Sequence, residues 1–310
     1  MATYETRVEE FTGLTTDTGF ITNWCTDVAR EIIAALPAEY LEFMSETKID
    51  TDGAAGIALN NCRILYADKA GIMAVQKPAA MRAKFILATS IHLATNSSPI
   101  YYKLADKAYV LPGGGNIHVI EFPVIAFGDD YGSYASTDKV PEEIEPLIVY
   151  GVSMRFILKT MRELREALPT MPAISSADLV LLGVTLGAGV TIAEPLQKAQ
   201  YFIDAGATLE GDSAAAALSV QTSIAGDDFT KARASIEAAR QELERANTII
   251  KSVQLADNPA LSKIKVLLEN YTTHVSSYLQ QHDKLVGTYG MLYKLYREGL
   301  DNLIGKQDQR

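Results

Sequence analysis

FTKARASIEAARQELERANTIIKSV, residues 229–253, places an apolar residue at every a and d position of four consecutive heptads. The a positions are Phe229, Ile236, Leu243 and Ile250, and the d positions are Ala232, Ala239, Ala246 and Val253. A seven-residue repeat of this kind predicts a long helix with one continuous apolar seam.

A second heptad pattern follows directly. Its a and d positions are Leu261, Ile264, Leu268, Tyr271, Val275, Tyr278, His282, Leu285, Tyr289, Leu292 and Tyr296. Between the patterns, Asn258 is a good N-cap and Pro259 suits the first turn of a new helix. We therefore predict an antiparallel helical hairpin in which large Tyr side chains face small Ala side chains. The expected neighbours are Val253 and Leu261, Leu243 and Tyr271, Ala239 and Val275, and Ile236 and Tyr278.

The second helix is expected to outrun the first. If the helices cover residues 227–256 and 260–299, the second helix is longer than the first by about 15 Å. The overhang is apolar and is predicted to be an assembly or packing surface. Its residues are Tyr289, Leu292, Tyr293, Tyr296 and Leu300. Residues 212–224 of the same chain could cover it, or a neighbouring subunit or another protein of the assembly could. Because Gly226-Asp227-Asp228 resembles a helix start, an intermolecular cover is favoured.

Residues 47–130 have a different character, because short alternating runs replace helical spacing. Residues 62–66 and 72–75 flank one turn, residues 100–104 and 108–111 flank a second, and residues 117–122 follow a Gly-rich turn. Runs rich in Tyr and Val and bounded by Gly and Pro predict a β-meander. We also expect one short helix here, over residues 79–89.

Helices are predicted on both sides of this region. One follows Thr16-Asp17-Thr18 and ends at Pro37; another begins near Pro141 or Pro146 and ends at Pro169. The first ten residues show no clear period. The predicted fold class is α+β, mainly α. It has a helical core (residues 1–46 and 131–211), an inserted small β-rich domain (47–130), and a long C-terminal antiparallel helical hairpin with its tail (212–310).

Composition narrows the function classes. The 310 residues carry a net charge of −10, which argues against a broad basic surface for nucleic acid. Two cysteines cannot build a disulfide scaffold or a four-thiolate metal site. The acidic N-terminus is no secretory signal, and the longest apolar run, residues 179–192, is too short to span a bilayer. We expect a soluble protein made in a reducing cytoplasm, with no membrane partner.

No catalytic, cofactor-binding or metal site is expected. The four histidines form no ligand pattern, and His282 is predicted to be a polar core residue of the hairpin. Gly113-Gly114-Gly115 lacks the following Lys-Ser/Thr of a phosphate loop and indicates a hairpin turn. Asp50-Thr51-Asp52-Gly53 resembles half a calcium loop, but turn chemistry explains it better. The protein is therefore predicted not to be an enzyme.

Several short motifs carry a resemblance. Residues 98–103 are SPIYYK, residues 109–115 are YVLPGGG, residues 121–123 are EFP, and residues 140–151 are VPEEIEPLIVYG. Together with the order of helix, β-rich insertion, helix and helical hairpin, they resemble the adaptor, or head–tail connector, proteins of tailed bacteriophages. In that family a recurrent pattern opens the helix after the β-region, matched here by Pro141, Glu143, Ile144, Glu145, Leu147, Ile148 and Tyr150.

The resemblance implies a virion structural protein of the neck. Such a protein would form a homo-oligomeric ring, expected to be a dodecamer, below the portal protein. It would extend the DNA channel and attach the tail or other neck proteins. Its acidic charge would let genomic DNA pass without specific binding. The alternatives are another tail-completion or baseplate component, or an enzyme with a carboxylate-based site.

Overall fold

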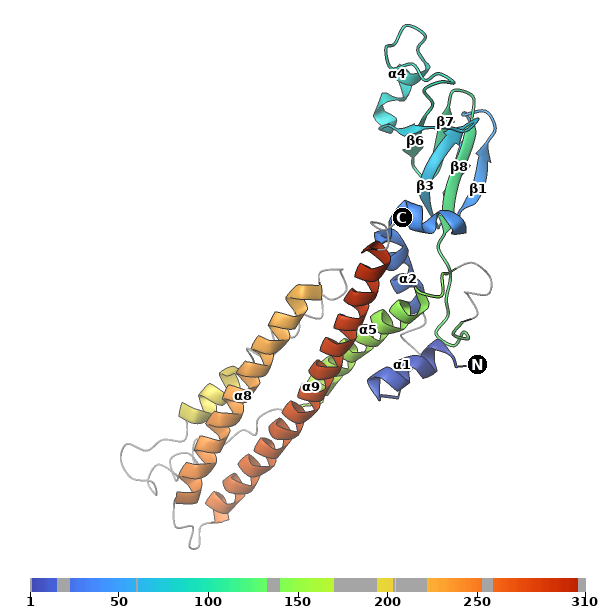
Figure 1. The fold of residues 1–310 in the computed structure, drawn as a ribbon. Coiled ribbons are helices and arrows are strands. Elements are labelled where there is room, and N and C mark those ends of the chain that lie inside the picture. The colour runs from blue at the N-terminus through green and yellow to red at the C-terminus, as the bar shows by residue number, and fades with distance from the viewer. Residues whose placement is uncertain are drawn as a thin grey trace. The chain divides into compact units, whose positions relative to one another are not determined.

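The fold was determined as a computed structural model, which describes residues 2–15, 23–59, 61–132, 140–169, 194–202, 204, 222–252 and 259–305. Long helices dominate these ranges (Figure 1), and along the chain the strands of two small four-stranded sheets come between the N-terminal helices and the helix that begins at Glu145. The predicted class, α+β and mainly α with an inserted β-rich part and a C-terminal helical hairpin, is confirmed.

The chain divides into two compact units. One comprises Met1–Val152 and Leu295–Arg310, and the other comprises Ser153–Lys294. Helix α5 (Glu145–Glu166) and helix α9 (Pro259–Gly305) contribute residues to both. The units are described separately below.

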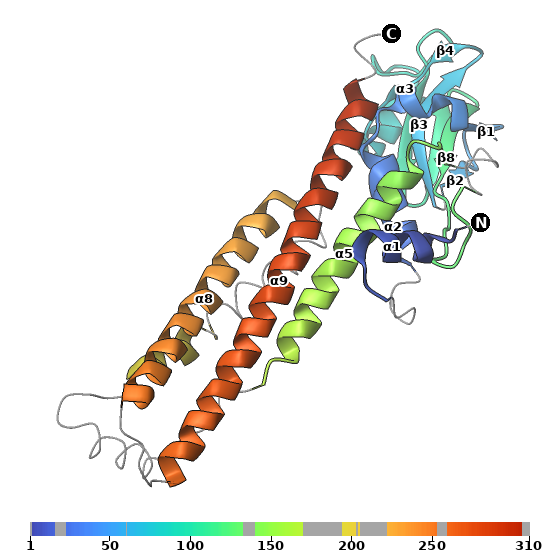
Figure 2. The same cartoon turned by 60° about the horizontal axis from the view of Figure 1, so that its bottom comes forward.

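The helical hairpin consists of α8 (Thr222–Ser252) and α9, which run side by side (Figure 2). Every heptad a and d side chain that is described between Ile236 and Leu292 is buried. These side chains are Ile236, Ala239, Leu243, Ala246, Ile250, Ile264, Leu268, Tyr271, Val275, Tyr278, His282, Leu285, Tyr289 and Leu292. The seven-residue repeat therefore identified the packed faces of both helices.

The hairpin is antiparallel, but its register differs from the predicted one. Asn247 Nδ2 donates to Thr272 Oγ1 at 2.9 Å, and Arg233 Nη2 donates to Asp283 Oδ2 at 2.9 Å. These partners lie two to five residues further along α9 than the predicted pairs imply. The sequence period fixes which face is buried, whereas the register depends on the connection between the helices, so the pairing was misplaced by about one turn.

The start of α8 corrects a second expectation. The helix begins at Thr222, so Gly226 lies inside it and not at its N-terminus. Four further side chains pack against the inner face of the hairpin. Leu196 and Ala199 come from a helical stretch over residues 194–202, Leu164 lies in the last turn of α5, and Leu168 follows that helix. The expectations for residues 179–192, for residues 212–221 and for Val253 fall outside the described residues.

Two helices open the other unit. Helix α1 (Tyr4–Thr12) was missed, although Thr3 caps it by accepting from the Thr6 amide and Gly13 ends it in the left-handed conformation. Helix α2 (Trp24–Ala35) matches the predicted helix before Pro37, and its described part begins after residues 16–22. Short turns follow, α3 (Ala38–Leu41) and η1 (Glu42–Met44).

The first sheet has the strand order β1-β8-β3-β4. Its strands are β1 (Glu46–Asp50), β8 (Gly115–Glu121), β3 (Cys62–Lys69) and β4 (Ile72–Met73). Strand β8 pairs antiparallel with both β1 and β3 (Figure 1). Strand β8, which corresponds to the predicted strand over residues 117–122, thus lies inside the first sheet between β1 and β3.

The second sheet has the order β2-β7-β6-β5. Its strands are β2 (Ile57–Ala58), β7 (Lys107–Leu111), β6 (Ile100–Leu104) and β5 (Val75–Gln76). Strands β6 and β7 form the predicted antiparallel hairpin. The predicted short helix is the pair η2 (Ala79–Met81) and α4 (Arg82–Ile86), which ends at Ile86 and not near Thr89.

The second sheet is covered on both faces, as the alternation of its side chains shows. Tyr101 and Val110 belong to a core shared with Ile64 and Val119 of the first sheet. Their chain neighbours Tyr102, Tyr109 and Leu111 point the other way and pack with Phe85 and Ala94. Residues 79–98 thus close a second small core over this sheet, which explains the run of buried residues in β7.

The two turns with possible ligand chemistry serve the fold. The Asp50 carboxylate is buried and accepts from the backbone amides of Gly53 at 3.2 Å and Val110 at 2.9 Å. Gly114 has a φ of +83°, and a Cβ there would lie 2.1 Å from the Asp50 carbonyl oxygen. Only glycine fits so close to another backbone strand, so the Gly-rich turn is explained by packing.

Candidate functional site

Among the residues that the structure describes, no group of three or more His, Cys, Asp or Glu side chains could hold a metal ion. No described helix combines the length and apolarity that spanning a bilayer requires. His282 is fully buried, with its ring 5.6 Å from that of Tyr278, and His118 lies 2.8 Å from Asp68 Oδ2.

The residues that carry the connector resemblance form the anchored start of α5. Ile144, Leu147 and Ile148 are buried, and Tyr150 makes an edge-to-face contact with Phe11 of α1 at 5.2 Å. Glu145 is almost fully buried, at 1% exposed, and its Oε1 accepts from the Tyr4 hydroxyl at 3.3 Å. The pattern therefore ties α5 to α1 through the Tyr4–Glu145 hydrogen bond and the Phe11–Tyr150 ring contact.

The electrostatics of this anchor favour a protonated tyrosine. Burial and the neighbouring Glu145 carboxylate raise the pKa of Tyr4 far above its usual value. Burial likewise raises the pKa of Tyr131, whose ring stands edge-on to Tyr4 at 5.7 Å, with Arg7 over it at 5.2 Å. The phenol of Tyr4 therefore remains a hydrogen-bond donor to Glu145 near neutral pH, and this contact joins α1 to the start of α5.

The structure divides the predicted interface on α9 into covered and accessible residues. Leu292 and Tyr289 are buried within the chain, so they offer no surface. Tyr293, Tyr296 and Leu300 are half-buried. The predicted stripe is therefore narrower than its sequence suggests, and three of its five side chains remain accessible.

Part of the overhang is covered by an element that the sequence did not suggest. A Cβ built on Gly299 would lie 2.4 Å from Leu147 Cδ2, so the end of α9 contacts the start of α5. Leu303, one turn further along, is also buried. The two candidate covers were residues 212–224 and an intermolecular partner; at Gly299 the cover is α5 of the same chain.

A second apolar surface was not predicted. Residues 86–93 comprise the last residue of α4 and the chain that follows it (Figure 1). They expose Ile86, Leu87, Ile91 and Leu93, and Ile91 is 94% exposed. We call residues 86–93 the apolar loop. Four of its eight residues are large and aliphatic, and this density outside the predicted strands is the signal that could have identified it. Contiguous exposed apolar side chains are typical of interaction surfaces.

Comparison with known proteins adds no relative. No protein-family model matches the chain, and no curated protein and no solved structure shows significant similarity to it.

Proposed function

We propose that this protein is a structural component of a bacteriophage virion, a head–tail connector. It would form a ring below the portal in the neck, extend the DNA channel and attach the tail. Its partners would be copies of itself, the portal protein and neighbouring neck or tail proteins. The protein would act by assembly and not as an enzyme.

The observation that carries this proposal is the order of elements together with the packing of the recurrent motif. A helical part is interrupted by two small sheets and followed by a long helical hairpin, the order that the connector resemblance implies. The motif residues Ile144, Leu147 and Ile148 are buried at the start of the helix that follows the sheets. Side chains that define a family pattern are expected at such anchoring positions.

The exposed apolar side chains give independent support for assembly. Ile91 of the apolar loop is almost fully exposed, and Tyr293 and Tyr296 of α9 are half-buried. A monomer gains nothing by keeping such side chains in water, whereas a subunit interface would bury them. In the proposed ring, neighbouring copies of the same chain would bury these side chains.

The first experiment measures the assembly state. The purified chain is examined by light scattering and electron microscopy, alone and after mixing with the portal protein of the same virus. We expect rings, with a mass near twelve times the 33.7 kDa of the chain, either alone or on portal particles. A monomer, dimer or tetramer that ignores portal particles would contradict the proposal.

The second experiment tests the two surfaces with variants. Ile91→Asp should prevent ring formation or docking while leaving the circular dichroism spectrum unchanged, because Ile91 is almost fully exposed. Thr89→Asp, which adds the same charge at an exposed site of the loop without removing apolar area, is the matched control. If both variants assemble normally, the apolar loop takes no part in the ring.

The α9 surface is tested separately. The double variant Tyr293→Asp, Tyr296→Asp should keep the chain folded but abolish rings or docking. Tyr293→Phe, Tyr296→Phe keeps the apolar area and serves as its control. Intact assembly in the Asp variant, or unfolding of the monomer, would exclude this surface as an interface.

A further inference from the structure

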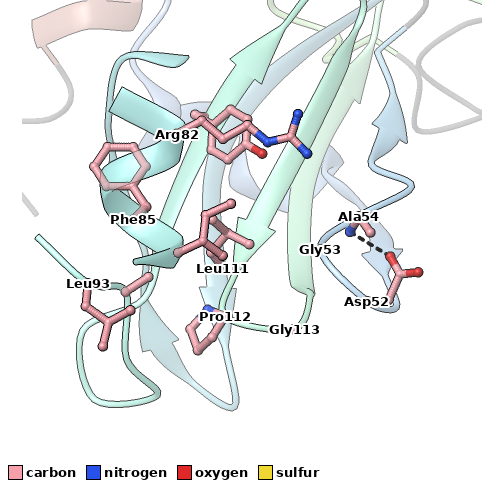
Figure 3. A pocket seen from close by; sticks show the side chains of 12 residues that line it. Asp52, Gly53, Ala54, Arg82, Phe85, Leu93, Leu111, Pro112 and Gly113 are labelled. Carbon is pink, nitrogen blue, oxygen red and sulfur yellow. Dashed lines mark hydrogen bonds between the residues drawn. The ribbon is translucent and has the colours of Figure 1, made fainter. Parts of the chain in front are cut away.

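A pocket of about 350 Å³ lies beside the second sheet, between α4 and the turn at Asp52–Ala54. Its wall is mainly apolar and includes Phe85, Leu93, Leu111 and Pro112. Figure 3 shows Arg82 at one end of this wall and Pro112 and Gly113 at the other. The volume lies at the lower end of the range in which proteins bind small ligands.

Arg82 is the cationic group of the pocket. Its guanidinium lies 5.8 Å from the centre of the Tyr109 ring, and it forms no ion pair with any residue that the structure describes. An arginine has five N–H donors in a planar fork that matches a carboxylate, and the ring contact does not use that fork. The guanidinium is therefore available to an anionic ligand.

Tyr102 provides a second, independent indication. Its side chain lines the pocket and is fully buried, stacked on Tyr109 with ring centres 5.1 Å apart. The hydroxyl has no hydrogen-bond partner among the described residues. Burial raises the pKa of Tyr102, against the opposing effect of Arg82, so the phenol is a donor. Buried hydroxyls of native proteins are nearly always paired, and an unpaired one at a pocket indicates a missing acceptor.

We propose that this pocket binds an apolar molecule that carries a carboxylate, with Arg82 pairing to the carboxylate and Tyr102 donating to one of its oxygens. The apolar body would occupy the space beside Phe85, Leu93 and Leu111. This proposal does not depend on the connector function, because it uses only the side chains of the pocket.

The remaining charge of the pocket selects against a more highly charged ligand. Hydrogen bonds from the Ala55 and Ala54 amides lower the pKa of Asp52, so this lining residue is anionic. Figure 3 shows Asp52 on the side of the pocket away from Phe85 and Leu93. A phosphate dianion would be repelled by it and would lose more hydration in the apolar pocket than a carboxylate.

Binding requires one local rearrangement. The Tyr102 hydroxyl is sealed from solvent, whereas the Arg82 side chain, whose charge acts on that phenol, is exposed. A ligand therefore reaches the hydroxyl only when the side chains that cover it shift.

The carboxylate could belong to a free organic acid or to the C-terminus of a polypeptide that ends in an apolar residue. The test uses titration calorimetry on the full chain with 3-phenylpropionate and with a tetrapeptide ending in Phe. The neutral controls are 3-phenylpropanamide and the same peptide with an amidated C-terminus. Binding of the acid indicates a free acid as ligand, and binding of the peptide alone indicates a chain terminus; either result supports the proposal.

Variants distinguish this site from adventitious binding. Arg82→Gln should weaken the affinity by about tenfold or more, and Tyr102→Phe by about three- to tenfold. Lys84→Gln removes an exposed cation of α4 that does not line the pocket, and it should leave the affinity unchanged. Absence of binding by both probes at about 10 mM, or equal affinity in Arg82→Gln, would overturn the proposal.

Discussion

Gly299 of α9 lies so close to Leu147 of α5 that a Cβ on the glycine would come within 2.4 Å of Leu147 Cδ2. Leu147 belongs to the motif that opens α5, and Gly299 lies beside the predicted interface residue Leu300. The contact therefore joins the stretch that carries the connector resemblance to the stretch predicted for assembly. It is possible only because residue 299 has no side chain.

The first prediction concerns this contact. Alanine in place of an unhindered helical glycine stabilises a protein by up to about 1 kcal/mol. Gly290→Ala should show this gain, because nothing lies within 4 Å of its added Cβ. Gly299→Ala should be less favourable than Gly290→Ala by about 1 kcal/mol or more, because Leu147 must move. Urea unfolding followed by circular dichroism measures both, and equal gains would show that the contact is absent.

The second prediction concerns the seam of the hairpin. Ala239 is fully buried on the inner face of α8. Ala239→Trp should cost about 1–3 kcal/mol, because the larger side chain overpacks the seam. Ala234→Trp, at an exposed position of the same helix, is the control and should change the free energy of unfolding little. Equal stability of the two variants in urea would mean that Ala239 does not face α9.

The third prediction concerns pH. Burial would raise the pKa of Asp68, but hydrogen bonds from His118, the Gly71 amide and Asn116 outweigh burial and hold it below its usual value. A carboxyl with a lowered pKa contributes stability at neutral pH that is lost as the pH falls below about 5. Asp68→Asn should therefore lower stability at pH 7 and reduce its loss on acidification.

Urea unfolding between pH 3 and 7 checks this expectation. Asp301→Asn, which removes an exposed carboxylate from α9, provides the comparison. An Asp68→Asn variant whose stability falls with acid as steeply as that of the unmodified chain would contradict the assignment.

The fourth prediction concerns the two thiols. Cys25 is fully buried in α2, and burial together with Asp129 raises its pKa to about 12. Because only the thiolate reacts, Cys25 should resist a disulfide reagent at pH 8 until the protein is unfolded. The half-buried Cys62 should react in the native protein, although its pKa is also raised by burial.

Spectrophotometric counting of thiols gives a direct result. The native chain should release one equivalent of the reagent's coloured thiolate and the unfolded chain two, matching its two cysteines. Cys62→Ser should release none in the native state. Fast reaction of Cys25 in that variant would show that the α2 core opens readily.

The elements that were predicted correctly have patterns that repeat within a few residues. The heptads marked the buried faces of α8 and α9, and the β6–β7 hairpin was evident from two short runs around one turn. The pairing of β8 with β1 joins residues near 116 to residues near 48, and no local pattern reports such a partner. Helix α1 was missed because its buried residues, Tyr4, Val8 and Thr12, span only three positions of one face.

The candidate surfaces show the same division. The apolar stripe on α9 was visible in the sequence, but its contact with α5 at Gly299 was not. Residues 86–89 of the apolar loop were predicted to be the end of a helix, but α4 ends at Ile86. Exposure depends on what other parts of the chain cover, and the sequence does not state this.

The sequence by itself determined the α+β class, the two long helices and the position of the Gly-rich turn at residues 113–115, because each depends on residue spacing or turn-forming residues within a short stretch. Only the tertiary structure decided the register of the hairpin, the contact between Gly299 and Leu147, and the meeting of Arg82 with Tyr102 at one pocket. These relationships join residues that are distant along the chain. They depend on how segments that are far apart in the sequence pack together at high density. A local residue pattern reports only its own segment, so it does not identify the packing partner.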